Sequence, residues 1–96
     1  MFAISFDMVI GDLKKHYGEP YNNAYFEISI VLERYDFFRA QGSVYLCEKN
    51  DMANLVDAID ALAENDWFAK SVRDIRAFKV ENWSNFTDRV KRKAIK

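Results

Sequence analysis

The N-terminal stretch from Met1 to Ile10, MFAISFDMVI, decides the fold that this sequence predicts. Large apolar side chains occupy every second position, at Phe2, Ile4, Phe6 and Met8. A period of two is typical of a β-strand that buries one of its two faces. Asp7 therefore lies on the opposite face, at the end of the strand.

The composition indicates one folded domain, which we expect to span residues 1–96. Half of the 96 residues (50%) are hydrophobic, so the chain can bury enough apolar surface to offset the entropy lost on folding. Charged residues make up 30%, and the formal net charge is −1. That balance gives no general affinity for nucleic acid, although a local basic patch is compatible with it.

Cys47 is the only cysteine and His16 the only histidine, which excludes an intramolecular disulfide and a zinc site built from Cys and His. The opening apolar run contains an Asp and is too short to span a membrane. No Lys or Arg precedes it, whereas a signal peptide would have a positively charged residue there. We therefore expect a soluble, cytoplasmic protein without a membrane partner.

Two later segments have the spacing of amphipathic helices. Before the first of them, Gly11-Asp12 and residues 16–20 have the composition of a loop. Pro20 suits the first position of the first helix, and Asn50 or Asp51 can cap the second. The apolar positions are Tyr21, Ala24, Tyr25, Ile28, Val31, Leu32 and Tyr35 in the first helix, and Met52, Leu55, Val56, Ile59 and Leu62 in the second.

The segment between these helices, FFRAQGSVYLCE at residues 37–48, alternates like a strand. Gly42 permits either a bulge in one bent strand or the turn of a tight hairpin, and the sequence leaves both open. One side of the segment carries Phe38, Ala40, Gly42, Val44 and Leu46, and the other carries Arg39, Gln41, Ser43, Tyr45 and Cys47.

The C-terminal part begins with a β-rich segment, residues 71–81, that has apolar residues on both sides. Trp83 and Ser84 are expected to open a short helix with Phe86 and Val90 facing inward. We expect the tail after about residue 90 to be frayed and its charges to be solvated. The basic residues of this end are Arg89, Lys91, Arg92, Lys93 and Lys96.

If Gly42 forms a hairpin turn, the order of elements is βαββαβ. This order predicts an α+β, ferredoxin-like sandwich, in which two helices cover one face of an antiparallel sheet and a short C-terminal helix is added. The uncovered face would be too polar for an interior and too apolar for plain solvent, so we expect a two-fold homodimer there. The residues assigned to that face are Ser5, Asp7, Arg39, Gln41, Ser43 and Tyr45.

Asp7 has two interpretations at this stage. The plain one is a solvated carboxylate that accepts hydrogen bonds in the following turn. The functional one needs neighbours: Ser43 and Gln41 can hydrogen-bond a phosphate oxygen or a nucleobase. Across a dimer axis, two Asp7 carboxylates at close range would recruit a divalent cation such as Mg²⁺. The residues that can bind phosphate as bidentate donors are Arg39, Arg73 and Arg76.

Other candidate residues have stronger structural explanations. His16 suits a surface histidine, and Asp74 suits ion pairs with Arg73 and Arg76 rather than an RNA clamp. The sequence has no phosphate-binding glycine loop, nucleophile elbow or HExxH motif, which removes most common enzyme classes. The aromatic residues considered for base stacking are Tyr21, Tyr25, Trp67 and Trp83, of which the tyrosines suit the core.

Five motifs together closely resemble the virulence-associated protein D family (VapD). They are MFAISFDMVI, GEPYNNAYFEI, QGSVYL, DMANL and WFAKSVRDIRAFKVENWSNFTD. The resemblance runs nearly end to end, and only residues 47–50 and the tail after about residue 89 depart from it. It implies a ferredoxin-like homodimer, related in fold to the small CRISPR-associated nucleases of spacer acquisition.

The resemblance also implies an endoribonuclease that acts as the toxin of a type II toxin–antitoxin pair and is silenced by a small antitoxin protein. The carboxylate at the end of the first strand, Asp7 in SFDM, would be catalytic. QGSVYL would supply Gln41 and Ser43 to the site, and SVRDIRAF would supply Arg73 and Arg76. Asp7 would act as a general base on a 2′-hydroxyl or water, or as a Mg²⁺ ligand, and no organic cofactor is expected.

Two alternatives stay open on the sequence. One is a non-catalytic RNA-binding adaptor that keeps a nuclease-like fold. The other is a protein-binding module that uses the uncovered sheet face. Salt-sensitive RNA binding that persists without cleavage would favour the first, and a tight protein complex without RNA binding would favour the second.

Overall fold

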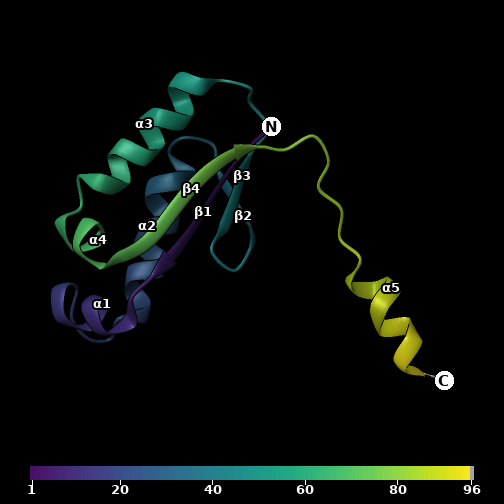
Figure 1. Ribbon diagram of the computed structural model, residues 1–96, viewed down its shortest axis with the longest axis horizontal. Helices are drawn as coiled ribbons and strands as arrows, with labels where there is room; N and C mark the ends of the chain where they lie inside the picture. The colour runs from purple at the N-terminus through teal and green to yellow at the C-terminus, as the bar shows by residue number, and fades with distance from the viewer. Residues whose placement is uncertain (96) are drawn as a thin grey trace.

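The computed structural model of the protein describes residues 1–95, which form a sheet, helices on one side of it and a C-terminal extension (Figure 1). The elements in chain order are β1 (Phe2–Met8), α1 (Ile10–His16), α2 (Asn22–Glu33), β2 (Phe38–Gln41), β3 (Val44–Cys47), α3 (Met52–Ala63), α4 (Asp66–Ser71), β4 (Val72–Lys79), α5 (Thr87–Arg92) and a short 3₁₀ helix (Lys93–Ile95).

The sheet has the strand order β2-β3-β1-β4, and every neighbouring pair is antiparallel. β1 is central: Phe2 lies opposite Cys47 of β3 on one side and opposite Lys79 of β4 on the other. This order, with α2 and α3 inserted between strands, confirms the predicted α+β, ferredoxin-like architecture.

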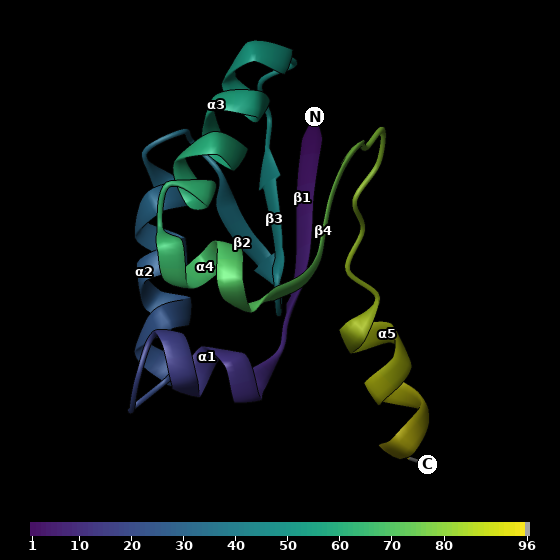
Figure 2. The same ribbon diagram turned by 60° about the vertical axis from the view of Figure 1, so that its left-hand side comes forward.

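The core lies between the sheet and the helices α2 and α3, which cover the same face (Figure 2). The alternation in the N-terminal stretch is confirmed, because all four of its large apolar side chains are buried there. The core includes Phe2, Ile4, Phe6 and Met8 of β1, Ile28 and Leu32 of α2, and Leu55 and Leu62 of α3.

The start of α3 shows why the chain turns into a helix at this point. The Asp51 side chain accepts a hydrogen bond from the backbone N–H of Asn54 at 3.1 Å, which satisfies one of the free donors of the first turn. The predicted cap is therefore confirmed. The predicted apolar stripe is too wide, because Met52 and Val56 are exposed on a groove between α3 and β4.

Gly42 forms the turn of a tight β2–β3 hairpin, with φ at +49°, a conformation that strains most residues with a side chain. A bulge is also present, but at Ala40, where the register passes from Arg39 opposite Tyr45 to Gln41 opposite Val44. The sequence left turn and bulge as alternatives, and the structure contains both at different residues.

The structure also contains a helix that the sequence did not predict. Residues expected to form a loop after β1 form α1, and the next helix begins at Asn22 rather than at Pro20. α1 has 7 residues and buries only Leu13. It therefore has no repeated apolar spacing by which a helix could be predicted from the sequence.

After β4 the chain leaves the sandwich as a C-terminal arm, residues 81–95, on the side of the sheet opposite α2 and α3 (Figure 2). Phe86 and Val90 are 63% and 67% exposed, so the expectation that they face inward is wrong. The radius of gyration is 15.3 Å, against about 12 Å for a compact domain of this length. The extended arm explains the difference.

Within residues 1–95, no helix is both long enough and apolar enough to cross a membrane.

Candidate functional site

The end of β1 meets the turn of the β2–β3 hairpin at one end of the sheet, where these strands terminate. Ser5 lies opposite Val44, and the backbone N–H of Phe6 donates to the carbonyl oxygen of Ser43 at 3.2 Å. Asp7 follows directly in the chain. The structure therefore brings Asp7 and Ser43, which are 36 residues apart in the sequence, to the same end of the sheet.

Asp7 is an exposed carboxylate in a group of alternating charges. Its side chain is 70% exposed, and Oδ2 lies 3.7 Å from Nε of Arg73. Across the β1–β4 ladder, Asp7 faces Asp74, and Asp74 Oδ2 accepts a hydrogen bond from Nε of Arg76 at 2.9 Å. Both arginines thus form ion pairs here, and both remain largely exposed.

The hairpin residues do not all lie where their alternation placed them. Arg39 and Tyr45 are cross-strand partners, and Tyr45 is 3% exposed with its ring stacked on Phe6. The prediction that Arg39, Ser43 and Tyr45 share the uncovered face with Ser5 is therefore wrong, since Ser43 also lies on the α2 side. The register between β1 and β3 is the reason, because it sets Tyr45 opposite the buried Ile4. The bulge at Ala40 then puts Gln41 on the other side from Arg39.

Ser43 and Arg39 line a hollow of about 590 Å³ between α2 and the hairpin. Nε of Arg39 donates to the carbonyl oxygen of Gly42 at 2.8 Å, which ties the guanidinium group to the turn. The whole lining is Phe6, Tyr25, Phe26, Ser29, Glu33, Arg39, Gly42, Ser43 and Tyr45. A phosphate held there would meet a hydroxyl group and an arginine.

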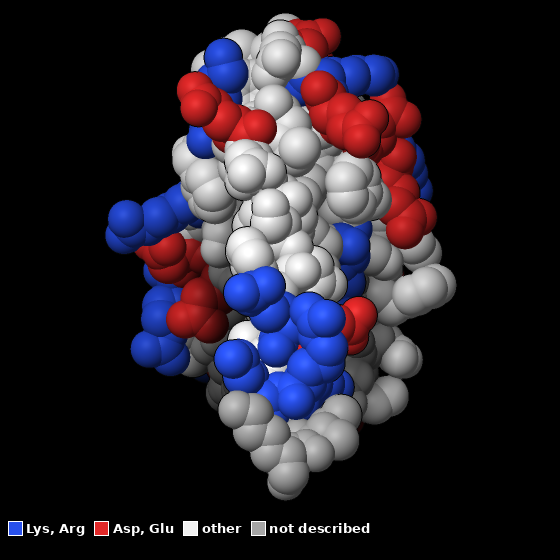
Figure 3. All heavy atoms as spheres, turned by 90° about the vertical axis from the view of Figure 1, so that its right-hand side faces the viewer, with Lys and Arg blue, Asp and Glu red and all other residues white. Residues whose placement is uncertain are grey.

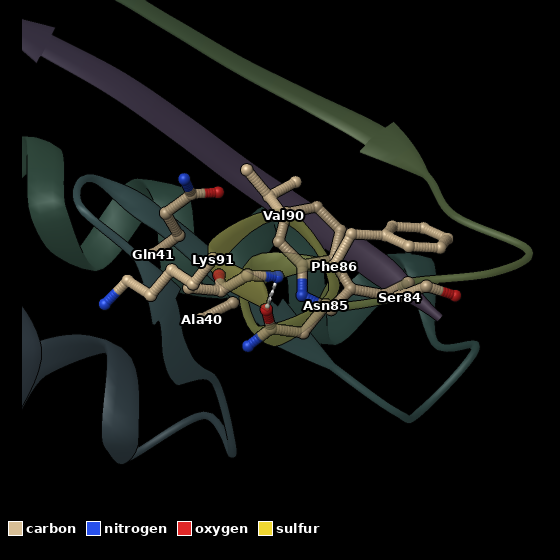
Figure 4. A pocket seen from close by; sticks show the side chains of 9 residues that line it. Ala40, Gln41, Ser84, Asn85, Phe86, Val90 and Lys91 are labelled. Carbon is tan, nitrogen blue, oxygen red and sulfur yellow. Dashed lines mark hydrogen bonds between the residues drawn. The ribbon is translucent and has the colours of Figure 1, made fainter. Parts of the chain in front are cut away.

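Gln41 lies in a different place from Ser43. It lines a second hollow, of about 660 Å³, between β2 and the C-terminal arm (Figure 4). Residues of the arm that line the same hollow include Asn85, Phe86 and Lys91. The structure therefore separates the two residues of the QGSVYL motif into two neighbouring hollows.

Two tyrosines that line the hollow between α2 and the hairpin have raised pKa values. Burial raises the pKa of Tyr25 above its usual value, and the nearby Tyr21 and Asp7 raise it further. Burial also raises the pKa of Tyr45, partly offset by the Arg39 guanidinium and by a hydrogen bond with Ser29. Both phenols therefore stay protonated at neutral pH and can donate a hydrogen bond.

The remaining candidates lie apart from this end of the sheet or are partly buried. His16 is exposed at the end of α1, as expected of a surface histidine. Trp67 packs edge-to-face on Tyr17, with ring centroids 5.0 Å apart, and Tyr21 belongs to the rim of the core. Trp83 lies on the arm and is 41% exposed.

A metal site is not built by protein side chains alone within residues 1–95, where no group of three or more His, Cys, Asp or Glu is suitably placed. Mg²⁺ commonly binds through one or two carboxylates together with substrate phosphates. Asp7 and its cross-strand neighbour Asp74 have the oxygen donors that such a site needs.

Sequence reasoning missed Asp74 and Tyr25 as neighbours of Asp7. Asp74 was interpreted only as a partner of the arginines, because the register of β4 against β1 is not readable from either strand. Tyr25 was assigned to the core by its helical spacing. No local sequence signal marks either contact.

Comparison with known proteins gives consistent findings. The family model of CRISPR associated protein Cas2 matches residues 1–88. Endoribonuclease VapD 1 of Riemerella anatipestifer is 67% identical over 87 residues, which cover 91% of this chain and 98% of the relative.

Two further relatives align over similar lengths. Endoribonuclease VapD of Dichelobacter nodosus is 58% identical over 91 residues, 95% of this chain and 98% of the relative. Endoribonuclease VapD of Helicobacter pylori is 52% identical over 93 residues, 95% and 99% of the two chains. These identities confirm the resemblance seen in the five sequence motifs.

Proposed function

This chain belongs to the family of CRISPR associated protein Cas2 and to the VapD family, and we propose that it is an endoribonuclease that cleaves single-stranded RNA. The observation that carries the proposal is the position of Asp7. It is an exposed carboxylate at one end of the sheet, beside a hydroxyl-bearing turn and two arginines. The relatives named as endoribonucleases support the reaction class.

Asp7 is the catalytic carboxylate in this proposal. As a general base it takes the proton of a 2′-hydroxyl or of a water molecule, and the resulting oxygen attacks the phosphorus. The 5′-oxygen leaves and takes a proton from solvent. Arg73 lies close enough to Asp7 to bind the same phosphate, since a guanidinium group offers several donors. Ser43 donates its hydroxyl hydrogen to an oxygen of an adjacent phosphate, because its hollow lies on the α2 side of the sheet.

If Mg²⁺ takes part, Asp7 and Asp74 are the residues that would hold it, and the ion would polarise the scissile phosphate. The two possible nucleophiles, the 2′-hydroxyl and water, give different products. Attack by the 2′-hydroxyl leaves a 2′,3′-cyclic phosphate, whereas attack by water leaves a linear phosphate.

The site lies at a cleft between two copies of the chain. Large apolar side chains are exposed on the uncovered sheet face and on the arm, and a second copy would remove both sets from water. These side chains are Phe38 and Phe78 of the sheet, and Trp83, Phe86 and Val90 of the arm. Two-fold packing would bring two Asp7 side chains to one cleft.

The protein acts in the cytoplasm as the toxin of a type II toxin–antitoxin pair. Its substrate is messenger RNA, and a small antitoxin protein silences it by covering the cleft. Expression of the active chain alone should arrest growth, and co-expression of the antitoxin should restore it.

Cleavage of a labelled single-stranded RNA tests the proposal. Wild type and Asp7→Asn, purified identically, are assayed in Mg²⁺ and in EDTA. A positioned general base contributes about 10²- to 10⁴-fold, so the variant should lose at least about 10²-fold in kcat. Asp57→Asn, an exposed carboxylate on α3, is the matched control and should cleave normally.

Activity of wild type in EDTA would assign general-base chemistry, and loss of activity in EDTA would assign a metal. Equal cleavage by wild type and Asp7→Asn would reject Asp7 as the catalytic residue. RNA binding without any cleavage by wild type would instead support the non-catalytic adaptor.

A further inference from the structure

The formal charge of the chain is divided between the sandwich and the arm. Residues 1–80 carry nine Lys or Arg and thirteen Asp or Glu, a formal charge of −4, whereas residues 81–96 carry five and two, a formal charge of +3. An RNA strand approaching Asp7 therefore meets a sandwich that repels it overall. The arm is the segment with the opposite sign.

The cations of the arm are exposed to solvent and can bind an anionic ligand. Arg89, Lys91 and Arg92 lie on α5, and Lys93 follows it. Within residues 1–95, none of these four forms an ion pair. Lys and Arg side chains gather in one patch on the side of the molecule where the arm lies, as Figure 3 shows.

The cations lie on more than one side of α5, since Lys91 lines the same hollow as Phe86 and Val90, and Lys93 comes three residues after Val90. Phe86 and Val90 are four residues apart and share one face, whereas Arg89 and Arg92 are three apart and share another. Arg89 and Arg92 can therefore stay in solvent while Phe86 and Val90 pack against a second copy.

The arm also lies beside the candidate site. Lys91 and Gln41 line the same hollow between α5 and β2 (Figure 4). Gln41 is two residues before Ser43, whose carbonyl oxygen bonds to the residue preceding Asp7. A single-stranded RNA that leaves the end of the sheet at Asp7 would reach the arm after crossing this hollow.

We propose that the basic residues at the end of the arm, Arg89, Lys91, Arg92 and Lys93, form an RNA-phosphate site that holds the strand flanking the scissile bond. This inference rests on the proposed RNA substrate. The four residues follow position 88, where the match to the Cas2 family model ends. The site is therefore additional to the catalytic end of the sheet.

The test measures RNA binding in an Asp7→Asn background, with a labelled single-stranded 20-mer and a salt titration. One variant changes Arg89, Lys91, Arg92 and Lys93 to Gln. A matched control changes Lys15, Arg34, Lys49 and Lys70 to Gln, which alters net charge equally at exposed positions on the helix side. Sedimentation velocity is run on every variant.

The arm variant should bind at least about tenfold more weakly at low salt, and its log–log salt slope should be shallower by about 2–3, since each phosphate contact to a single strand contributes about 0.7. The control variant should keep the parental slope. On an Asp7-intact background, the arm variant should raise KM and leave kcat nearly unchanged.

Equal losses in both quadruple variants would overturn the proposal, because net charge and not the arm would then govern binding. An unchanged slope in the arm variant would also overturn it, as would a change in oligomeric state, which would assign the cations to a protein contact. If wild type fails to cleave RNA but the arm variant still loses binding, the proposed nuclease activity fails while the RNA site stands.

Discussion

Asp7 and Asp74 face each other directly across the β1–β4 ladder, and each is paired with a different arginine of β4. Like charges directly opposite in an antiparallel pair destabilise a sheet. This end of the sheet therefore keeps two carboxylates together at some cost in stability, as functional sites commonly do.

Replacing either carboxylate should stabilise the fold while it reduces activity. Asp7→Asn and Asp74→Asn should each raise the free energy of unfolding by about 0.2–1 kcal/mol at low salt, because the cross-strand repulsion is removed. The measurement is urea unfolding at two ionic strengths. The gain should shrink at high salt, because both side chains are exposed and screened. A loss of stability in both variants would show that the ion pairs outweigh the repulsion.

The hairpin turn should depend on the positive φ of Gly42. Gly42→Ala should lower the free energy of unfolding by about 1 kcal/mol, because a Cβ is disfavoured at φ +49°. Gly42→Asn should restore most of the loss, since Asn tolerates this conformation. Both are measured by urea unfolding, and RNA cleavage should fall with the Ala variant because the turn positions Ser43.

Gly11 provides the matched control for the turn. It lies in α1, and a Cβ there would meet no atom within 4 Å. Gly11→Ala should therefore raise the stability, by about 0.5–1 kcal/mol. Similar losses at both glycines would contradict the assignment of the strain to the turn.

Stability above neutral pH should report on the buried phenol of Tyr45. Its pKa is raised from 10.0 chiefly by burial, so the folded state binds the proton more tightly than the unfolded chain does. The resulting stabilisation is complete below the unfolded pKa and is lost as the pH rises through the folded pKa. The free energy of unfolding should therefore fall above about pH 10.

Tyr45→Phe should make that alkaline loss smaller, because the variant has no phenol to ionise at this position. Urea unfolding of both proteins between about pH 8 and pH 11 measures the difference. Tyr25 and Tyr17 also have raised pKa values, so part of the alkaline loss should remain in the variant. Identical pH profiles would rule out Tyr45 as a contributor.

The exposed apolar face of the arm should control dimer formation. Phe86→Ser with Val90→Ser removes two side chains that are 63% and 67% exposed in the single chain, so the fold of the monomer should be little affected. Sedimentation velocity should show a shift from dimer to monomer. RNA cleavage should fall in parallel if the cleft needs two copies.

Ile30→Ser is the matched control for the arm, because Ile30 is also exposed but lies on α2, which covers the other face of the sheet. It should leave the sedimentation coefficient unchanged. A dimer that persists in the arm variant, or a monomeric wild type, would contradict the proposed interface.

Local patterns in the sequence determined much of the sandwich. The period of two in Phe2–Met8 and the helical spacing of α2 follow from which face each element buries, and both are visible along the chain itself. The capping carboxylate of Asp51 is equally local, because it bonds three residues ahead. The family motifs further indicated Asp7, Ser43 and the arginines of β4.

Only the tertiary structure decided how these elements meet. The register that sets Asp7 against Asp74, the β1–β3 register that places Tyr45 and Arg39 on the helix side, and the separation of Gln41 from Ser43 all depend on contacts between strands. A one-residue change in pairing reverses the face of every following side chain. The exposed course of the arm is decided in the same way, because its apolar residues fit a helix equally well whether they face inward or toward a second copy.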